Sequence, residues 1–261
     1  MTKDKKRIVF IISIVAVCSL AVAVSVYAII TNASFSKNEE ENVSVYDFDS
    51  IFNNEITSNV YNKEEVEEIA YLGYDIYETD SIKYDISIKL PKILIETENS
   101  NKINEDIYNL FIGKAIEIQD NSTVYTKYDV QYTGYINENL LSIVIKCNLK
   151  AGSNPQKKIV TTYMYDIKED KILNIQDLIE NKNLNGEKIQ KRIRDSIKEL
   201  AESDKTITDI GYNVYIREPE SEIYDIENIT EFYINQDGEI FVIFAYGNTN
   251  YTTKTDVIKI M

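Results

Sequence analysis

Apolar and polar residues alternate along the stretch that begins at Ile82. The segment IKYDISIKL carries an apolar side chain at every second position from Ile82 to Leu90, and Pro91 follows it. A period of two is typical of a strand with one buried face, and a proline favours the end of such a strand because it lacks a backbone N–H. We therefore predict a half-buried strand over residues 82–90.

Two later segments change to the helical period. In INEDIYNLFIGKAIEI (103–118) apolar residues return every three or four positions, and NGEKIQKRIRDSIKELAE (185–202) repeats the pattern with charged residues elsewhere. Each segment predicts an amphipathic helix that packs one face on a core. A short helical turn is predicted over 174–180. Residues that could cap the two long helices are Asn101 or Asn104 for the first and Asn183 or Asn185 for the second.

Short strands joined by tight turns account for most of the remaining pattern. An Asp-Gly pair separates two apolar runs within 231–247, which is typical of a β-hairpin. Short hairpin connections require antiparallel pairing. The sequence therefore predicts the α+β class, with two amphipathic helices packed on an antiparallel sheet. The other predicted strands are 124–136, 140–148, 159–166 and 255–260.

The N-terminal region predicts a single transmembrane helix. Residues 8–30 carry no formal charge, and at about 1.5 Å per residue they would extend roughly 35 Å, enough to cross a hydrocarbon core of about 30 Å. Basic residues precede the segment and acidic residues follow it, which places the N-terminus in the cytoplasm and residues 31–261 outside. A signal peptide cleaved near Val26-Tyr27-Ala28 is the alternative, but its apolar region is usually shorter, so we favour an uncleaved anchor.

Charge narrows the class of partner. The chain has 28 basic and 43 acidic residues, a net charge of −15. The basic residues before the apolar segment make the remainder still more acidic. Such a field repels nucleic acid and anionic polymers and attracts cationic proteins, and it also keeps a protein soluble. We therefore expect no nucleic-acid partner.

The residue inventory excludes several kinds of catalytic centre. The chain has no histidine, which excludes the zinc-protease motifs and the histidine-dependent triads. No glycine-rich phosphate loop is present, and the start of a calcium loop at Asp47 fails because Ile51 stands at a ligand position and the required glycine is missing. An enzyme that uses carboxylates alone stays open as the least favoured alternative. We expect no enzyme activity, no cofactor and no metal.

Two polar loops stand out as candidate binding elements. The segment AGSNPQKK (151–158) is long for a hairpin connection, which usually has about two to five residues. The segment REPESEIYDIENITE (217–231) holds a single basic residue among many carboxylates, so it could receive a cationic ligand or could be a solvated loop. Its candidate contact residues are Glu218, Glu220 and Glu222.

From about residue 82 to 260 the order of short motifs resembles a known family. The resemblance is to the paired extracytoplasmic domain of RsiV-type lysozyme-sensing anti-sigma factors. Four segments follow the order found there: YDISIKLPKI, NKINEDIYNLF, the hairpin YDVQYTGYINENLLSIVI and the run VTTYMYDIKEDKILNIQDLIE. The same unit precedes the catalytic domain of PdaC-type polysaccharide deacetylases. The family's Gly-Gly-Ala-His-Pro loop corresponds here to a loop that contains Gly152, Asn154 and Pro155. The family's paired tyrosines correspond to Tyr246 and Tyr251.

The departures from this family bear on function. Asn154 replaces the family's histidine, so a titratable and metal-binding group is lost, while Gly152 and Pro155 keep the residues that shape a turn. The short N-terminal stub cannot supply a sigma-binding segment, and no deacetylase domain follows. The predicted parts are a cytoplasmic stub (1–7), a transmembrane anchor (8–30), a linker and ambiguous region (31–73), a first α+β subdomain (74–150) and a second one (151–261).

The sequence and the resemblance together predict a membrane-anchored extracytoplasmic binding or sensing module. The resemblance implies a cationic protein such as lysozyme as the partner. The alternative is a cell-wall accessory protein that binds peptidoglycan or another envelope protein.

Overall fold

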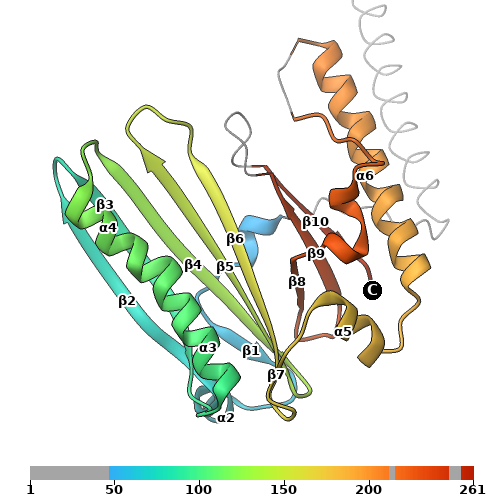
Figure 1. Cartoon of the computed structure of the whole chain (residues 1–261), viewed down its shortest axis with the longest axis horizontal. Helices are drawn as coiled ribbons and strands as arrows, with labels where there is room; N and C mark the ends of the chain where they lie inside the picture. The colour runs from blue at the N-terminus through green and yellow to red at the C-terminus, as the bar shows by residue number, and fades with distance from the viewer. Residues whose placement is uncertain (1–46, 212–214, 247–253) are drawn as a thin grey trace, which may run out of the picture. The chain divides into compact units, whose positions relative to one another are not determined.

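The computed structural model describes residues 47–211, 215–246 and 254–261 (Figure 1). The predicted stub and membrane segment, residues 31–46 of the predicted linker and ambiguous region, and Tyr251 lie outside these residues. Within them, no helix is both long enough and apolar enough to span a bilayer. The chain divides into two units, and the second, Val45–Met261, holds every described element.

The first sheet has seven strands in the order β2-β3-β4-β5-β6-β7, with β1 paired to β4 off this path. Most neighbours are antiparallel, but β3 and β1 each run parallel to β4. Its strands are β1 (Ile56–Ser58), β2 (Ala70–Asp80), β3 (Tyr84–Ile93), β4 (Thr126–Asn137), β5 (Leu140–Ala151), β6 (Lys157–Asp166) and β7 (Lys171–Ile172).

A second sheet has three antiparallel strands in the order β10-β9-β8. The chain is therefore a mixed α+β protein with mainly antiparallel sheets, as the sequence predicts. The strands are β8 (Glu231–Ile234), β9 (Ile240–Ala245) and β10 (Thr255–Lys259). The helical segments are η1 (Phe48–Ile51), α2 (Lys63–Ile69), α3 (Glu98–Ile107), η2 (Tyr108–Ile112), α4 (Gly113–Asn121), α5 (Ile175–Asn181), α6 (Gly186–Asp209), η3 (Glu222–Tyr224) and η4 (Ile226–Asn228).

One continuous helical run, α3–η2–α4, connects the parallel strands β3 and β4 and lies along one face of the large sheet (Figure 1). A parallel pair needs such a crossover because a tight turn leaves the second strand antiparallel to the first. Ile103 and Ile107 on this run are fully buried against Ile86, Ile88 and other apolar side chains of the sheet. The middle turn, η2, is a π-helix, which shifts the apolar face by one residue.

The cap of this helical run corrects one sequence prediction. Neither Asn101 nor Asn104 is the N-cap; Thr97 is, and its hydroxyl accepts the Ser100 N–H in a capping box. Asn104 instead donates to the Ile93 carbonyl oxygen at 2.8 Å and accepts the Ile93 N–H at 2.9 Å. The amide of Asn104 therefore ties the helix to the end of β3. For α6 the prediction is confirmed, because Asn185 accepts the Lys188 N–H.

The strand boundaries also differ from the sequence prediction. Pro91 does not end β3, which continues to Ile93 with Pro91 opposite Leu72. The register shifts at this point, between Leu72 and Tyr74, so that β2 adjusts to the missing N–H. The predicted linker and ambiguous region (31–73) contains β1 and α2, and β2 begins near its end, at Ala70.

The β5–β6 hairpin bears on the predicted boundary between residues 150 and 151. The two strands pair from Leu140–Asp166 to Leu149–Lys157, and both belong to the large sheet. The boundary therefore falls at the tip of a hairpin within one sheet. The second sheet begins later, at β8.

The two sheets meet where the edge of β8 crosses β5 and β6. The Phe232 N–H donates to Thr162 Oγ1 at 3.0 Å, and the Ile234 N–H donates to Ser142 Oγ at 3.0 Å. In return the Thr162 N–H donates to the Glu231 carboxylate at 2.6 Å. Hydroxyl groups of one sheet thus satisfy the strand edge of the other, and apolar side chains of both sheets pack around this contact.

We predict that Ser142→Ala destabilises the protein by about 1–3 kcal/mol, because Ser142 is fully buried and its removal leaves the Ile234 N–H without an acceptor. Chemical denaturation of both variants measures this, with Ser81→Ala on an exposed turn as the control. Equal stability of the two variants would show that the hydroxyl does not hold the sheets together.

Candidate functional site

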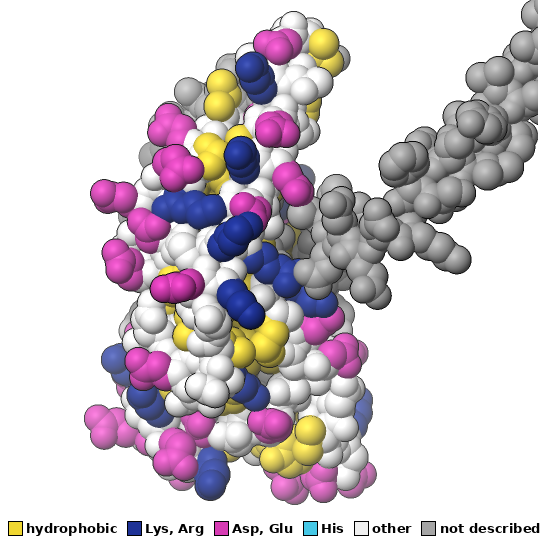
Figure 2. All heavy atoms as spheres, turned by 90° about the vertical axis from the view of Figure 1, so that its right-hand side faces the viewer, with side chains coloured by type: hydrophobic (Ala, Val, Ile, Leu, Met, Phe, Trp, Pro, Cys, Tyr) yellow, Lys and Arg dark blue, Asp and Glu magenta, His cyan; other side chains and the backbone are white. Residues whose placement is uncertain are grey.

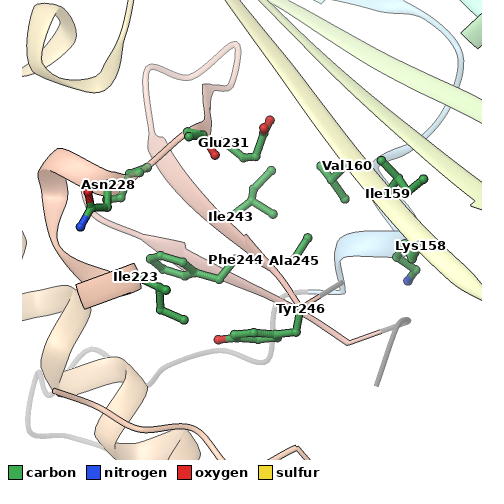
Figure 3. A pocket seen from close by; sticks show the side chains of 12 residues that line it. Lys158, Ile159, Val160, Ile223, Asn228, Glu231, Ile243, Phe244, Ala245 and Tyr246 are labelled. Atoms are coloured by element: carbon green, nitrogen blue, oxygen red, sulfur yellow. The ribbon is translucent and has the colours of Figure 1, made fainter. Parts of the chain in front are cut away.

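A cleft of about 370 Å³ lies beside the contact between the two sheets (Figure 3). Three segments that are distant in sequence form it: the start of β6, the chain from Ile223 to Glu231, and the end of β9 with the residue that follows it. Figure 3 shows side chains from all three segments around the same space. This volume is within the range of protein ligand sites.

The cleft has an apolar wall and an accessible apolar rim. Val160, Ile243 and Phe244 are buried and line the interior. Ile159 and Ile223, from opposite segments, are each 44% exposed. Burying this surface against a partner would contribute favourable free energy.

Glu231 supplies a carboxylate at one end of the cleft. Burial raises the pKa of Glu231 above its ordinary value, although hydrogen bonds from Thr162 and Thr230 oppose the shift. The Thr162 N–H donates to the Glu231 carboxylate at 2.6 Å. Within residues 47–211, 215–246 and 254–261, Glu231 forms no salt bridge. Its carboxyl group is therefore partly buried without a cation beside it, a state that a cationic ligand would relieve.

Lys158, on the other side of the cleft, has its charge already matched. Its ammonium group donates to both carboxylate oxygens of Asp49 at 2.9 Å, and Lys146 donates to the same carboxylate at 3.0 Å. Although burial acts to raise the pKa of Asp49, the hydrogen bonds and charges of the two lysines hold it below its ordinary value. This ion pair joins η1 to the start of β6.

Tyr246 lines the cleft with its ring while its hydroxyl is fixed from behind. The hydroxyl donates to Asp256 Oδ2 at 2.6 Å and lies 2.9 Å from the Tyr224 hydroxyl. The ring stacks on that of Tyr215 with centroids 4.3 Å apart. Burial, and then the charge of Asp256, raises the pKa of Tyr246 far above its ordinary value, so the phenol stays neutral.

A buried ion network holds Asp256 in turn. Arg217 Nε and Nη2 each donate to Asp256 at 2.5 Å, and Nη1 donates to Asp204 on α6. Lys254 donates to the second oxygen of Asp204 at 2.9 Å. Arg217 is 6% exposed. The network thus ties α6, the acidic segment and the second sheet together immediately behind Tyr246.

The predicted site residues do not all come together. Gly152, Asn154 and Pro155 are exposed at the tip of the β5–β6 hairpin, and none of them lines the cleft. Gly152 adopts a φ of +53°, and the Asn154 carbonyl oxygen accepts a hydrogen bond from Lys150. These contacts fit the reading of the loop as a turn.

The acidic and tyrosine predictions fare differently. Glu218, Glu220 and Glu222 are exposed beside the cleft wall that their segment forms, but their side chains do not line it. Tyr246 does line it, and Tyr251 lies outside the described residues.

The sequence reasoning missed Glu231 and the ion network. Arg217 carried a signal: it is the single basic residue at the head of the acidic segment, beside Pro219, and such an isolated arginine is often paired when buried. Cys147 is buried, as expected for a small apolar side chain, and burial raises its pKa to about 12.

The face that carries α6 has charges of both signs. Figure 2 shows Lys and Arg side chains interspersed with Asp and Glu over this face. Neighbouring turns of α6 are joined by pairs such as Lys191 with Asp195. The α6 face is therefore a typical solvated helix surface.

The chemistry that this arrangement offers is recognition. In the part of the chain that the structure describes, no group of three His, Cys, Asp or Glu residues could hold a metal ion. The cleft combines an apolar wall, one partly buried carboxylate and a fixed aromatic ring, which together suit the binding of an apolar and cationic group.

Two solved structures resemble the fold. A DUF3298 family protein from Pseudomonas aeruginosa aligns with a TM-score of 0.46 and 13% identity, over 72% of this chain and 88% of that one. A DUF3298 family member from Bacteroides fragilis aligns with a TM-score of 0.33 and 15% identity, over 67% of this chain and 80% of that one. No family model and no curated protein matches the chain.

We predict that Arg217→Met costs about 3–5 kcal/mol of stability, because it leaves Asp204 and Asp256 buried without their main cation. Lys191→Met is the control, since its pair with Asp195 is exposed and worth at most about 1 kcal/mol. Thermal and chemical unfolding measure both. A loss for Arg217→Met no larger than that of the control would contradict the role of the network.

The network also predicts a pH dependence. Although burial acts to raise it, the contacts with Arg217 and Lys254 lower the pKa of Asp204 below 3.8. A lowered folded-state pKa stabilises the protein above the unfolded value and loses that contribution as the pH falls through the folded one. The difference in the free energy of unfolding between the unmodified protein and Asp204→Asn should therefore decrease as the pH is lowered from 6. Asp195→Asn, at an exposed position, should show no such narrowing.

Proposed function

We propose that the chain is a membrane-anchored extracytoplasmic module that binds a cationic protein through the cleft between its two sheets. The observation that carries the proposal is the position of the acidic segment. Its residues 223–231 form one wall of the cleft, and Glu231 places a carboxylate on that wall. Glu218, Glu220 and Glu222 are exposed, and within the described ranges none of them forms a salt bridge.

Electrostatics favour a basic partner over an anionic one. The net charge of −15 attracts cations over long range, and the exposed carboxylates Glu218, Glu220 and Glu222 lie in the segment that also forms one wall of the cleft. Exposed charges of this kind raise the association rate more than the final affinity, and salt screens them over about 8–10 Å. The partly buried carboxylate of Glu231 and the apolar wall then hold the complex after encounter.

The sequence resemblance suggests which basic protein to test. Because the resemblance is to ectodomains that sense lysozyme, the proposed partner is lysozyme or a protein of similar charge. The predicted segment 8–30 would hold the module at the outer face of the cell membrane, where such a protein arrives. The role is binding, and the proposal involves no catalytic step.

A second candidate function is the binding of peptidoglycan or another envelope component. The observation in its favour is the fixed, neutral ring of Tyr246 on the cleft wall, since aromatic rings are suitable platforms for uncharged glycans. Purified cell-wall sacculi, sedimented with the protein, test it. Binding to sacculi without binding to lysozyme would select this function.

We predict that hen lysozyme binds the full chain, purified in detergent. The affinity should decrease as the salt concentration is raised from 50 to 300 mM. The triple variant Glu218→Gln, Glu220→Gln, Glu222→Gln should slow association by about tenfold at low salt, since these exposed charges belong to the segment that forms one wall of the cleft. Surface plasmon resonance measures the rates.

The matched control changes the net charge equally at exposed sites on α2 and β2: Glu64→Gln, Glu68→Gln, Glu78→Gln. It should associate at nearly the rate of the unmodified protein. Equal slowing by both triple variants would reduce the effect to net charge alone, and no binding by the unmodified protein would refute the proposal for lysozyme.

A further inference from the structure

Within the described residues, the outer edge of β6 has no strand partner where it lines the cleft. The Thr162 N–H points away from β5 to Glu231, and the Met164 carbonyl oxygen accepts the Leu173 N–H on that same side. Since alternate residues of a strand direct both backbone groups to the same edge, Val160 and Lys158 direct theirs outward as well. Among the described strands, β7 pairs with this edge only at Tyr165 and Asp166, so the edge next to the cleft has no strand partner.

The end of β9 presents a second unpaired edge to the same cleft. The Tyr246 N–H donates to the Lys254 carbonyl oxygen, on the β10 side. Its neighbour Ala245 therefore directs its backbone groups to the other side, the side of β8. Because β8 begins at Glu231, opposite Ile243, Ala245 lies beyond the start of β8 and has no partner in it.

These two edges bound one slot. Val160 and Ala245 both line the cleft, with Glu231 at the end where β8 begins (Figure 3). A chain placed there would continue the line of β8, with Ala245 on one flank and the edge of β6 on the other. Strand addition to an open edge supplies main-chain hydrogen bonds, and alternate side chains supply specificity.

We propose that the slot binds an extended peptide segment of a cationic partner as an added strand, with a Lys or Arg side chain of that segment paired to Glu231. The proposal rests on the proposed binding function and specifies its contact. Apolar side chains next to the basic residue would pack on Ile159 and Ile223 at the rim.

Charge selects this occupant over the chain itself. Glu231 is partly buried, and no basic side chain of the described residues pairs with it, so an arriving ammonium or guanidinium group supplies the missing counter-charge. The chain's own segment 31–45 carries Lys37 against three consecutive glutamates, and a second copy carries the same net charge of −15. Both would approach an acidic protein against repulsion.

The experiment uses immobilised peptides of the form acetyl-Thr-Val-X-Val-Thr, with X varied over the twenty amino acids, probed with the full chain. Overlapping peptides of the chain itself are included. We expect at least about tenfold stronger retention for X = Lys or Arg than for X = Gln or norleucine. Retention should be lost when the peptide amides are N-methylated, because methylation removes strand donors.

Two variants locate the effect. Glu231→Gln keeps an oxygen that accepts the Thr162 N–H but removes the charge, so the preference for Lys and Arg should disappear. Glu78→Gln, also on a strand but exposed, should keep it. Amide shifts at Val160 and Ala245 on titration with the Lys peptide place the peptide in the slot, and this reading needs no variant.

Several outcomes would overturn the inference. They are equal retention for all X, a Lys preference that survives Glu231→Gln, indifference to N-methylation, and strongest retention of peptides from the chain's own sequence. Failure of the proposed function gives a different result, namely a selective peptide array without binding of lysozyme. If lysozyme binds and the array shows no selectivity, the proposed function stands and the strand-addition mode is refuted.

Discussion

The arrangement of this protein depends on how the edge of β8 is satisfied. A strand edge inside a protein needs hydrogen-bond partners, and here two hydroxyl groups, of Thr162 and Ser142, take the place of a neighbouring strand. Because these hydroxyls project from the face of the large sheet, β8 crosses that face instead of joining the ladder. Within the described residues, this crossing leaves the edge of β6 and the end of β9 beside the same cleft.

A second constraint fixes the wall of that cleft. The acidic segment has little regular structure, consisting of short 3-10 turns, and its position depends on contacts at both ends. At one end Arg217 is held between Asp204 and Asp256, and at the other Glu231 receives the Thr162 N–H. Buried ion pairs of this kind contribute little net stability but impose strict geometry, because any other position leaves a charge unpaired. The same group of residues also fixes the orientation of Tyr246, because the Tyr246 hydroxyl donates to Asp256.

The regular elements could be predicted because their signals are local. Period-two and helical patterns marked β4, β5, the helix before β4, and α6 with its cap at Asn185. The strand β2 escaped because it lies at the sheet edge, where both faces are partly exposed and the alternation is weak. The strand end predicted at Pro91 was wrong because a register shift in the neighbouring strand accommodates the proline.

The site could be predicted only in outline. Tyr246 and the acidic segment were identified, but Glu231 resembles the other carboxylates of its segment in sequence. What distinguishes it is the Thr162 N–H and the burial that follows, and these arise from a contact between residues about seventy positions apart. The same holds for the pairing of Arg217 with Asp256, since no local pattern encodes a long-range partner.

The pairing of Asp49 with Lys158 has a mechanical consequence. Asp49 lies in η1, among the first residues that the structure describes, and Lys158 lies on the wall of the cleft. A pull applied to the chain from its N-terminal side therefore enters the fold at a residue that touches the cleft wall. Under the proposed anchoring through residues 8–30, tension on the chain and occupancy of the cleft would both act on Lys158 through its ion pair with Asp49.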